Sequence, residues 1–327
     1  MKPEGFSQPS LLMLNRALAA DLGLDLAWLE ANGAAVFSGS EVVDGAKPLA
    51  QAYAGHQFGQ FNPGLGDGRA LLVGEVVDPA GQRFDLHLKG SGTTPFSRRG
   101  DGRAALDSVG REYIVSEAMA ALGVPTTRAL AIVTTGETVM RERSAPGAVL
   151  TRVASSHLRV GTLELFAAQQ EHQKLAKLVQ YALRRHYPER VDTDNPAQAL
   201  LDAVAEAQGQ LVAHWMSIGF VHGVMNTDNV TLSGETIDYG PCAFMEAYDP
   251  ETVFSQIDQM GRYAYGNQPG IGAWNLARMA EALIEMLGPN TEAAVEQAQA
   301  SLELSRQSFA QSWIAHMRGK LGLTDAQ

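Results

Sequence analysis

The stretch that decides the fold reads His222-Gly223-Val224-Met225-Asn226-Thr227-Asp228-Asn229, and Asp238-Tyr239-Gly240 follows it. Short apolar runs at residues 220–225 and 230–232 flank this polar loop and predict strands on both sides of it. Asn229 and Asp238 then offer oxygen atoms near one point, with the carboxylate of Asp228 beside them. Mg²⁺ binds one or two carboxylates together with substrate phosphates, so the loop is a candidate Mg²⁺ or Mn²⁺ site. Polar loop residues that bond their own backbone would have the same composition, and this alternative stays open.

Toward the N-terminus, two apolar runs between residues 70 and 89 flank the turn Asp78-Pro79-Ala80-Gly81 and predict a β-hairpin. Apolar and polar residues alternate in its second strand, so Lys89 points away from the apolar layer. A helix is expected next, from about residue 107 to residue 122, because glycine and proline follow it. The hairpin and the helix therefore bring a strand lysine and helix carboxylates into one part of the chain.

The remaining pattern indicates an α+β protein. An apolar pattern led by Ser10 predicts an opening amphipathic helix through Leu18. Antiparallel strands are expected at residues 129–134, 137–141 (around the turn Thr135-Gly136) and 148–153. Beyond Gly161 apolar residues recur at three- and four-residue spacing, which predicts helices, among them residues 197–218 and two or three between 252 and 323. We expect two domains: a β-rich N-terminal lobe at residues 1–155 and a helical C-terminal lobe at residues 156–327.

Composition excludes several classes of protein. Of the 327 residues, 45% are hydrophobic and 19% are charged. The hydrophobic residues are numerous enough to form a buried core, and a chain of this composition is not generally disordered. The net charge of −11 argues against a protein that coats nucleic acid or an anionic membrane, so neither is an expected partner. Cys242 is the single cysteine, which excludes a disulfide framework and fits a reducing compartment. No apolar run has the length of a membrane span and no signal peptide is evident, so we expect a cytoplasmic protein.

Two further features suit phosphate binding. Glycine-rich turns at residues 64–69 and 89–92 could let backbone amides approach phosphate oxygens. Arginines gather at positions 98, 99, 103 and 111, and Arg152 and Arg159 lie near the expected domain boundary. Guanidinium groups suit bidentate contact with phosphate. The glycines could equally be ordinary turns, and the arginines could be paired with surface carboxylates.

A strand lysine, a helix carboxylate, then Asp-Asn and Asp-x-Gly in a helical domain is the order of functional residues in protein kinases. The catalytic aspartate of a kinase sits two residues after the histidine, and that position is Val224 here. A kinase that transfers the γ-phosphate would therefore lack its usual base.

The chain resembles the selenoprotein-O family, kinase-fold proteins that act as protein adenylyltransferases. The strings that carry this resemblance are AGHQFG at 54–59, LGDGR at 65–69, GDGRA at 100–104, HGVMNTDN at 222–229, DYGP at 238–241 and GRY at 261–263. The family binds ATP in a flipped orientation that offers the α-phosphate to the acceptor. Its members usually continue beyond this length, and many end with a redox-active cysteine or selenocysteine; redox control through such a tail is not expected here. Residues 255–259 also depart from the family pattern.

The resemblance implies roles for particular residues. The implied nucleotide-binding residues are Gly66, Gly68, Arg69, Lys89, Asp101, Gly102, Arg152, Arg159 and Asp238. Asp228 would be the proton acceptor, and Asn229 and Asp238 would bind the metal. Lys89 would pair with Glu112, with Glu117 as the alternative partner.

The expected function is transfer of AMP from ATP, or of UMP from UTP, to Ser, Thr or Tyr hydroxyls of proteins, with Mg²⁺ and with release of pyrophosphate. A kinase that transfers the γ-phosphate and a non-catalytic ATP-binding pseudokinase are the alternatives. Position 224 holds valine in place of a kinase's catalytic aspartate, which counts against the kinase. The presence of Asp228, Asn229 and Asp238 together counts against the second.

Overall fold

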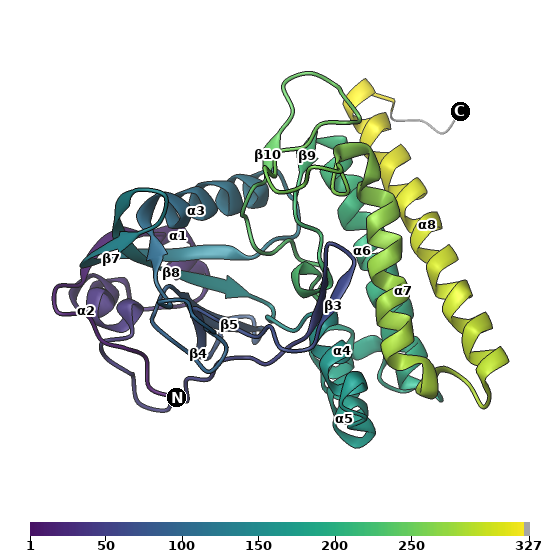
Figure 1. Ribbon diagram of the computed structural model, residues 1–327, viewed down its shortest axis with the longest axis horizontal. Coiled ribbons are helices and arrows are strands. Elements are labelled where there is room, and N and C mark those ends of the chain that lie inside the picture. Colours follow the sequence, from purple (N-terminus) through teal and green to yellow (C-terminus); the bar gives the residue numbers. More distant parts are fainter. Residues whose placement is uncertain (324–327) are drawn as a thin grey trace. The chain divides into compact units, whose positions relative to one another are not determined.

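The computed structural model describes residues 1–323 and divides into two compact units (Figure 1). The first unit comprises Met1–Ala52 and Gly64–His157, and the second comprises Tyr53–Pro63 and the chain from Leu158 onward. The sequence analysis placed one boundary after residue 155. In the structure the chain leaves the first unit after His157, and the short segment Tyr53–Pro63 belongs to the second unit although it lies in the N-terminal third of the sequence.

The first unit is built on an antiparallel sheet with strand order β1-β7-β8-β5-β4, and β6 pairs with β8. The strands are β1 (Ser10–Leu14), β4 (Ala70–Val77), β5 (Arg83–Lys89), β6 (Ala104–Ala105), β7 (Arg128–Met140) and β8 (Ser144–Ala154). β4 and β5 form the hairpin that the turn at residues 78–81 predicted. The mixed α and β composition with antiparallel pairing is confirmed.

The predicted opening helix is wrong. Ser10–Leu14 is the edge strand β1, paired with β7, and α1 (Arg16–Asp21) begins only after Asn15, whose side chain accepts a hydrogen bond from the Leu18 amide. The apolar pattern at residues 11–18 fits a strand followed by a short helix as well as one helix. Pairing with β7, more than a hundred residues away, provides the backbone hydrogen bonds that decide between them. Helix α2 (Leu26–Ser38) then covers the sheet, and its Leu29 and Phe37 are buried.

The predicted turn at Thr135-Gly136 is also wrong. β7 runs without a break from Arg128 to Met140, and the register with β8 shifts between Thr134 and Thr138. Gly136 has a φ of +75°, which suits an irregularity within the strand pair. The chain reverses instead between β7 and β8, beyond Met140.

Helix α3 (Leu106–Ala121) lies close to the predicted bounds, and its buried residues are Val109, Glu112, Ser116 and Met119. This spacing of three and four residues marks one helix face. Glu112 is 1% exposed, so the buried face of α3 includes a carboxylate. The alternating polar residues of β5 are likewise buried, Asp85, His87 and Lys89 all being 4% exposed or less.

The second unit is mainly helical. Its helices are α4 (Val160–Ala168), α5 (His172–His186), α6 (Pro196–Ser217), α7 (Gln268–Leu287) and α8 (Thr291–Leu321), with short 3-10 turns at Pro188–Arg190, Thr227–Asn229 (η2) and Tyr265–Asn267. Its strands are short: β2 (Gly55–Gln57) pairs with β3 (Gln60–Asn62), and β9 (Phe220–Val221) with β10 (Ala243–Phe244). The predicted strand at residues 230–232 is reduced to an isolated bridge between Arg159 and Thr231.

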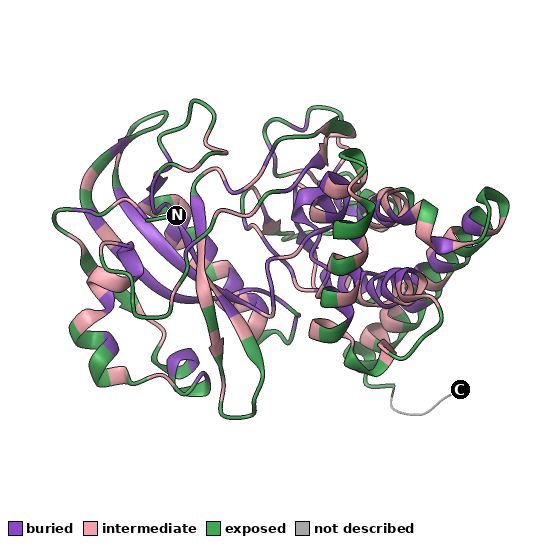
Figure 2. Cartoon of the chain, turned by 90° about the horizontal axis from the view of Figure 1, so that it is seen from below, coloured by how far each residue is buried: buried purple, intermediate pink, exposed green. Residues whose placement is uncertain are grey.

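The apolar faces of α4 to α7 form the core of this unit. Its fully buried residues include Leu163, Val179, Leu200 and Leu283. Figure 2 shows these inward faces as buried and the outer faces as exposed. Within residues 1–323, no helix combines the length and the apolar character that crossing a membrane requires.

Candidate functional site

In the first unit, Glu112 joins two buried cations. Lys89 Nζ lies 2.5 Å from Glu112 Oε2, and Arg152 Nε lies 2.5 Å from Glu112 Oε1. The β5–β8 register places His87 opposite Arg152, so Lys89, two residues along, and Arg152 project from the same face of the sheet. Lys89 and Arg152 are each 4% exposed. Lysine and arginine are the side chains that proteins use to bind phosphate oxygens, so this cluster has the chemistry for a nucleotide's phosphates.

The alternative partner of Lys89 is occupied elsewhere. Glu117 forms an ion pair with Arg128 at 2.7 Å and accepts hydrogen bonds from Asn15 and from the Ala129 amide. Burial opposes the ionised form, but these bonds outweigh it and hold the pKa of Glu117 below its usual value. The contact between Lys89 and Glu112 is thus the one that the sequence analysis favoured, while the part of either residue in catalysis stays a prediction.

Close packing within the protein restricts which residues fit at the glycine positions of the predicted nucleotide-binding set. Gly66 has a φ of +68°, and a Cβ there would lie 2.2 Å from the Phe96 ring. Gly102 also has a φ of +68°, and a Cβ there would lie 2.1 Å from the Gly92 carbonyl carbon. At Gly68 the nearest atom to a Cβ would be the Phe96 carbonyl oxygen at 3.0 Å. Only glycine fits the first two positions, so close packing inside the protein accounts for them and nucleotide contact remains a prediction.

Asp67, between two of these glycines, ties the glycine-rich loop to strand β5. Its Oδ2 accepts from the Gln51 amide at 3.0 Å and lies 3.1 Å from His87 Nε2. The His87 ring stacks on His157 with centroids 4.3 Å apart, and the His157 amide donates to Asp85. The sequence analysis assigned no role to these four side chains. For Asp85 and His87 the signal was the position of polar residues at every second place along β5, ending at Lys89, whereas Asp67 and His157 lie outside that strand.

Two other predicted nucleotide-binding residues of the first unit, Arg69 and Asp101, lie at its surface. Arg69 is exposed. Asp101 forms an ion pair with Arg141 at 2.8 Å, and hydrogen bonds from that guanidinium lower the pKa of Asp101 to about 2. Arg103 is paired with Glu4 and Glu137, which is the surface pairing that the sequence analysis held open.

The second unit holds the remaining predicted residues on one loop and the segments around it. Asp228 and Asn229 belong to the 3-10 turn η2 and are each 8% exposed. Asp228 Oδ2 accepts a hydrogen bond from Gln57 Nε2 at 3.3 Å. Asp228 Oδ1 is buried and has no hydrogen-bond partner among the residues that the structure describes. Burial raises the pKa of Asp228 to about 6, against the opposing charge of Arg159.

Arg159 lies beside the same loop. It is 4% exposed, its guanidinium stacks 4.3 Å above the Tyr53 ring, and its Nη1 donates to the Asp228 carbonyl oxygen at 3.2 Å. Arg152 and Arg159 therefore belong to different units, the first paired with a carboxylate and the second packed on an aromatic ring and on the loop backbone.

The residues proposed for the metal have the right chemistry. Asn229 Nδ2 donates to the Val224 carbonyl at 3.0 Å, which leaves the amide oxygen as the atom that this side chain can offer to a cation. Asp238, half-buried with a φ of +67°, contributes a carboxylate. Within residues 1–323 no group of three or more His, Cys, Asp or Glu side chains could hold a metal by itself. The donor set fits Mg²⁺, which takes hard oxygen ligands and completes its shell with water and substrate phosphates.

His222 joins the segment before Asp238 to the start of the Asp228 loop. Its Nε2–H donates to the Ile237 carbonyl at 2.9 Å, and its Nδ1 accepts from the Val224 amide at 3.3 Å. Full burial lowers the pKa of His222, so the ring is neutral and can serve as donor and acceptor at once. Val224, at the position of a kinase base, thus contributes only backbone groups here.

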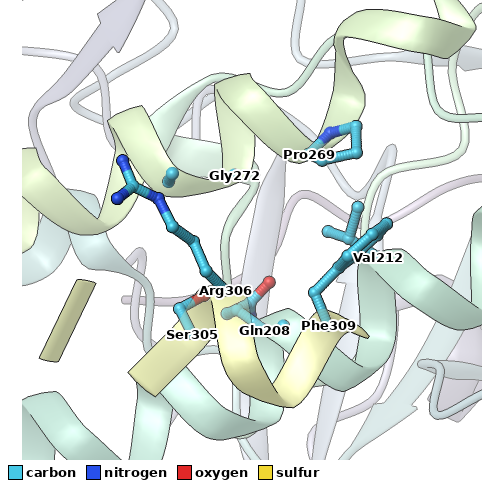
Figure 3. A pocket seen from close by; sticks show the side chains of 9 residues that line it. Gln208, Val212, Pro269, Gly272, Ser305, Arg306 and Phe309 are labelled. Carbon is cyan, nitrogen blue, oxygen red and sulfur yellow. The ribbon is translucent and has the colours of Figure 1, made fainter. Parts of the chain in front are cut away.

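A separate apolar pocket of about 90 Å³ lies between α6, α7 and α8 (Figure 3). Its lining residues are Gln208, Gly209, Val212, Pro269, Gly272, Ala273, Ser305, Arg306 and Phe309. None of the predicted site residues is among them.

Comparison with known proteins identifies the family. A family model described as protein adenylyltransferase SelO matches residues 1–327. The chain belongs to this SelO family. The resemblance drawn from the sequence strings is confirmed.

Curated relatives are similar along nearly the whole chain. Protein nucleotidyltransferase YdiU of Rhizobium etli is 60% identical over 321 residues, which is 98% of this chain and 64% of the relative. The protein of the same name from Cereibacter sphaeroides is 61% identical over 320 residues, 98% of this chain and 66% of the relative. The chain thus spans slightly less than two thirds of the length of these relatives.

Proposed function

We propose that this chain is a Mg²⁺-dependent protein adenylyltransferase that moves AMP from ATP to Ser, Thr or Tyr hydroxyls of proteins. Membership of a family described by that activity supports the proposal. The observation that carries it is Asp228, a buried carboxylate whose Oδ1 has no hydrogen-bond partner in the described part of the chain. It lies next to a metal-ligand candidate, Asn229, in a chain that has Val224 at the place of a kinase base.

We propose further that the two units correspond to the lobes of a protein-kinase-like fold. The order of the elements supports this: an antiparallel sheet with Lys89 on β5, then α3 with Glu112, then a helical unit with the Asp228 loop. Lys89 and Arg152, both held by Glu112, would bind phosphate oxygens of the nucleotide. Arg159 would help to hold the outer phosphates, which leave as pyrophosphate.

The reaction would use Asp228 as proton acceptor. The acceptor hydroxyl attacks the α-phosphorus, its oxygen forms the new P–O bond, and its proton goes to Asp228 Oδ1. The bond between the α-phosphorus and the oxygen that bridges to the β-phosphate breaks, and pyrophosphate leaves. Asn229 and Asp238 would hold a metal ion, which would neutralise part of the phosphate charge. A pKa of about 6 leaves Asp228 mostly ionised at pH 7 and able to take a proton.

Labelled nucleotides test the proposal. The chain is incubated with Mg²⁺ and with ATP labelled at either the α- or the γ-phosphate, and the intact mass of each modified protein is measured. We expect the α-label and a mass increase of one AMP, and the same assay with UTP measures nucleotide preference. A phosphate-sized adduct that carries the γ-label would establish a kinase, and ATP binding with neither label would favour a pseudokinase.

Asp228→Asn provides the matched variant for the base. It keeps the shape and the acceptor for Gln57 while it removes the proton acceptor, so transfer should fall by about 10²- to 10⁴-fold. Binding of ATP should be retained. If Asp228→Asn transfers AMP as fast as the unmodified chain, Asp228 is not the base.

A further inference from the structure

The segment Tyr53–Pro63 is distant in sequence from the Asp228 loop and is hydrogen-bonded to it within the second unit. The His56 amide donates to Thr227 Oγ1 at 2.7 Å, and the Phe58 amide donates to Asn226 Oδ1 at 3.2 Å. Between them the side chain of Gln57 donates to Asp228. Three consecutive residues of the β2–β3 hairpin therefore bond three consecutive residues of the loop that carries the proposed base.

The turn of this hairpin holds an unfavourable backbone conformation. Phe58 has a φ of +52°, in the left-handed region that a bulky residue seldom adopts. Its amide also donates to Tyr263 Oη at 3.1 Å, and its ring lies 5.1 Å from the Tyr263 ring. Tyr263 Oη in turn donates to Asn226 Oδ1 at 2.5 Å. Strain of this kind persists only where the surroundings enforce it, and here the enforcing groups are Asn226 of the loop and Tyr263.

The base of the hairpin is packed equally closely. The Ala54 amide donates to the Gly161 carbonyl at 2.9 Å, and a Cβ at Gly161 would lie 2.1 Å from the Ala54 oxygen. The same Cβ would lie 3.5 Å from Asp228 Cα. One end of β2 is thus fixed on α4 through Gly161 and the other on the loop through Asn226, so the Gln57 side chain between them has a defined position.

The two oxygens of Asp228 are made different by this arrangement. Oδ2 receives the Gln57 amide hydrogen, whereas Oδ1 is buried with no hydrogen-bond partner in residues 1–323. A carboxylate held at one oxygen cannot rotate freely, and its other oxygen keeps a constant direction.

We infer that Gln57 is a positioning residue for the transfer reaction: it holds Asp228 Oδ2 so that Oδ1 receives the proton of the acceptor hydroxyl. This inference rests on the proposed function. Gln57 acts through Asp228 and not on the nucleotide, so its loss affects turnover and leaves nucleotide affinity unchanged.

Gln57→Met tests the inference, because methionine has a similar length and no amide donor. Gln60→Met is the matched control, since Gln60 is the directly paired residue of the same hairpin and is exposed. AMP transfer is measured over a range of ATP concentrations. In Gln57→Met we expect kcat to fall about tenfold, as for loss of a hydrogen bond to a charged group, with KM for ATP unchanged. Gln60→Met should match the unmodified chain.

Amide hydrogen exchange of residues 226–229 gives a readout that does not depend on activity. Faster exchange is expected in Gln57→Met and not in Gln60→Met, because the loop loses one of its bonds to the hairpin. Unchanged exchange overturns the inference. An unchanged kcat, a raised KM with kcat preserved, or an equal loss in Gln60→Met also overturns it. If the unmodified chain transfers no AMP, the proposed function fails, and the exchange data still decide whether Gln57 positions the loop.

Discussion

Replacement of Glu112 by glutamine should destabilise the first unit strongly. The carboxylate contacts Lys89 Nζ and Arg152 Nε, each at 2.5 Å, and the three side chains are 2%, 6% and 5% exposed. So little solvent reaches them that the charges are poorly screened. Glutamine keeps the size but loses the charge, and only its oxygen can accept. Breaking a buried ion pair costs about 3–5 kcal/mol, and here one change affects two pairs.

Thermal unfolding measures this effect. A loss of about 3–5 kcal/mol corresponds to a fall in Tm of about 6–20 °C for a unit of this size. Glu117→Gln on the same helix is the control: its pair with Arg128 is partly exposed, so we expect a loss of only about 1 kcal/mol. Equal losses in the two variants, or less than about 1 kcal/mol for Glu112→Gln, would refute the reasoning that the buried carboxylate holds both cations.

Three further predictions concern the metal loop, the helical unit and pH. Asp238→Asn should abolish transfer through loss of a charged metal ligand and leave Tm nearly unchanged, because asparagine tolerates the positive φ; activity retained at ordinary Mg²⁺ would contradict this. Tyr187→Phe should lower the free energy of unfolding by about 1–3 kcal/mol in urea titrations, because the buried Leu232 carbonyl loses its donor; an unchanged midpoint would count against that bond. The pKa of Asp101 is lowered to about 2 by Arg141, so this ion pair stabilises the fold above pH 4, and its contribution is lost as pH falls toward 2. The two side chains are about half exposed, so Arg141→Ala should lower the free energy of unfolding by less than about 1 kcal/mol at pH 7 and leave it unchanged below pH 2.

The β4–β5 hairpin, α3 and α6 could be predicted from the sequence because their signals are local. A four-residue turn between alternating strands, or an apolar pattern ended by glycine, depends on neighbours within a few residues. The segment at residues 10–14 could not be predicted in this way. Its apolar residues suit a helix or a strand, and the choice depends on β7, which lies far along the chain.

The site shows the same difference between local signals and contacts of distant segments. Asp228, Asn229 and Asp238 were found from a short motif, and Lys89 and Glu112 from the order of a strand and a helix. The motif contains no sign that Gln57 would donate to Asp228, or that Arg152 would share Glu112 with Lys89. Each of these contacts joins residues at least 40 positions apart.

The sequence by itself determined the residue types that can bind phosphate and metal, the helices and hairpins with local signals, and the family. Only the tertiary structure decided which cation each carboxylate holds, which oxygen of Asp228 has no hydrogen-bond partner within residues 1–323, and that Tyr53–Pro63 joins the helical unit. The physical reason is that turns and helix ends are specified by short-range backbone preferences. Buried ion pairs and hydrogen bonds depend instead on which distant segments pack together, and the energy of that packing is spread over the whole core.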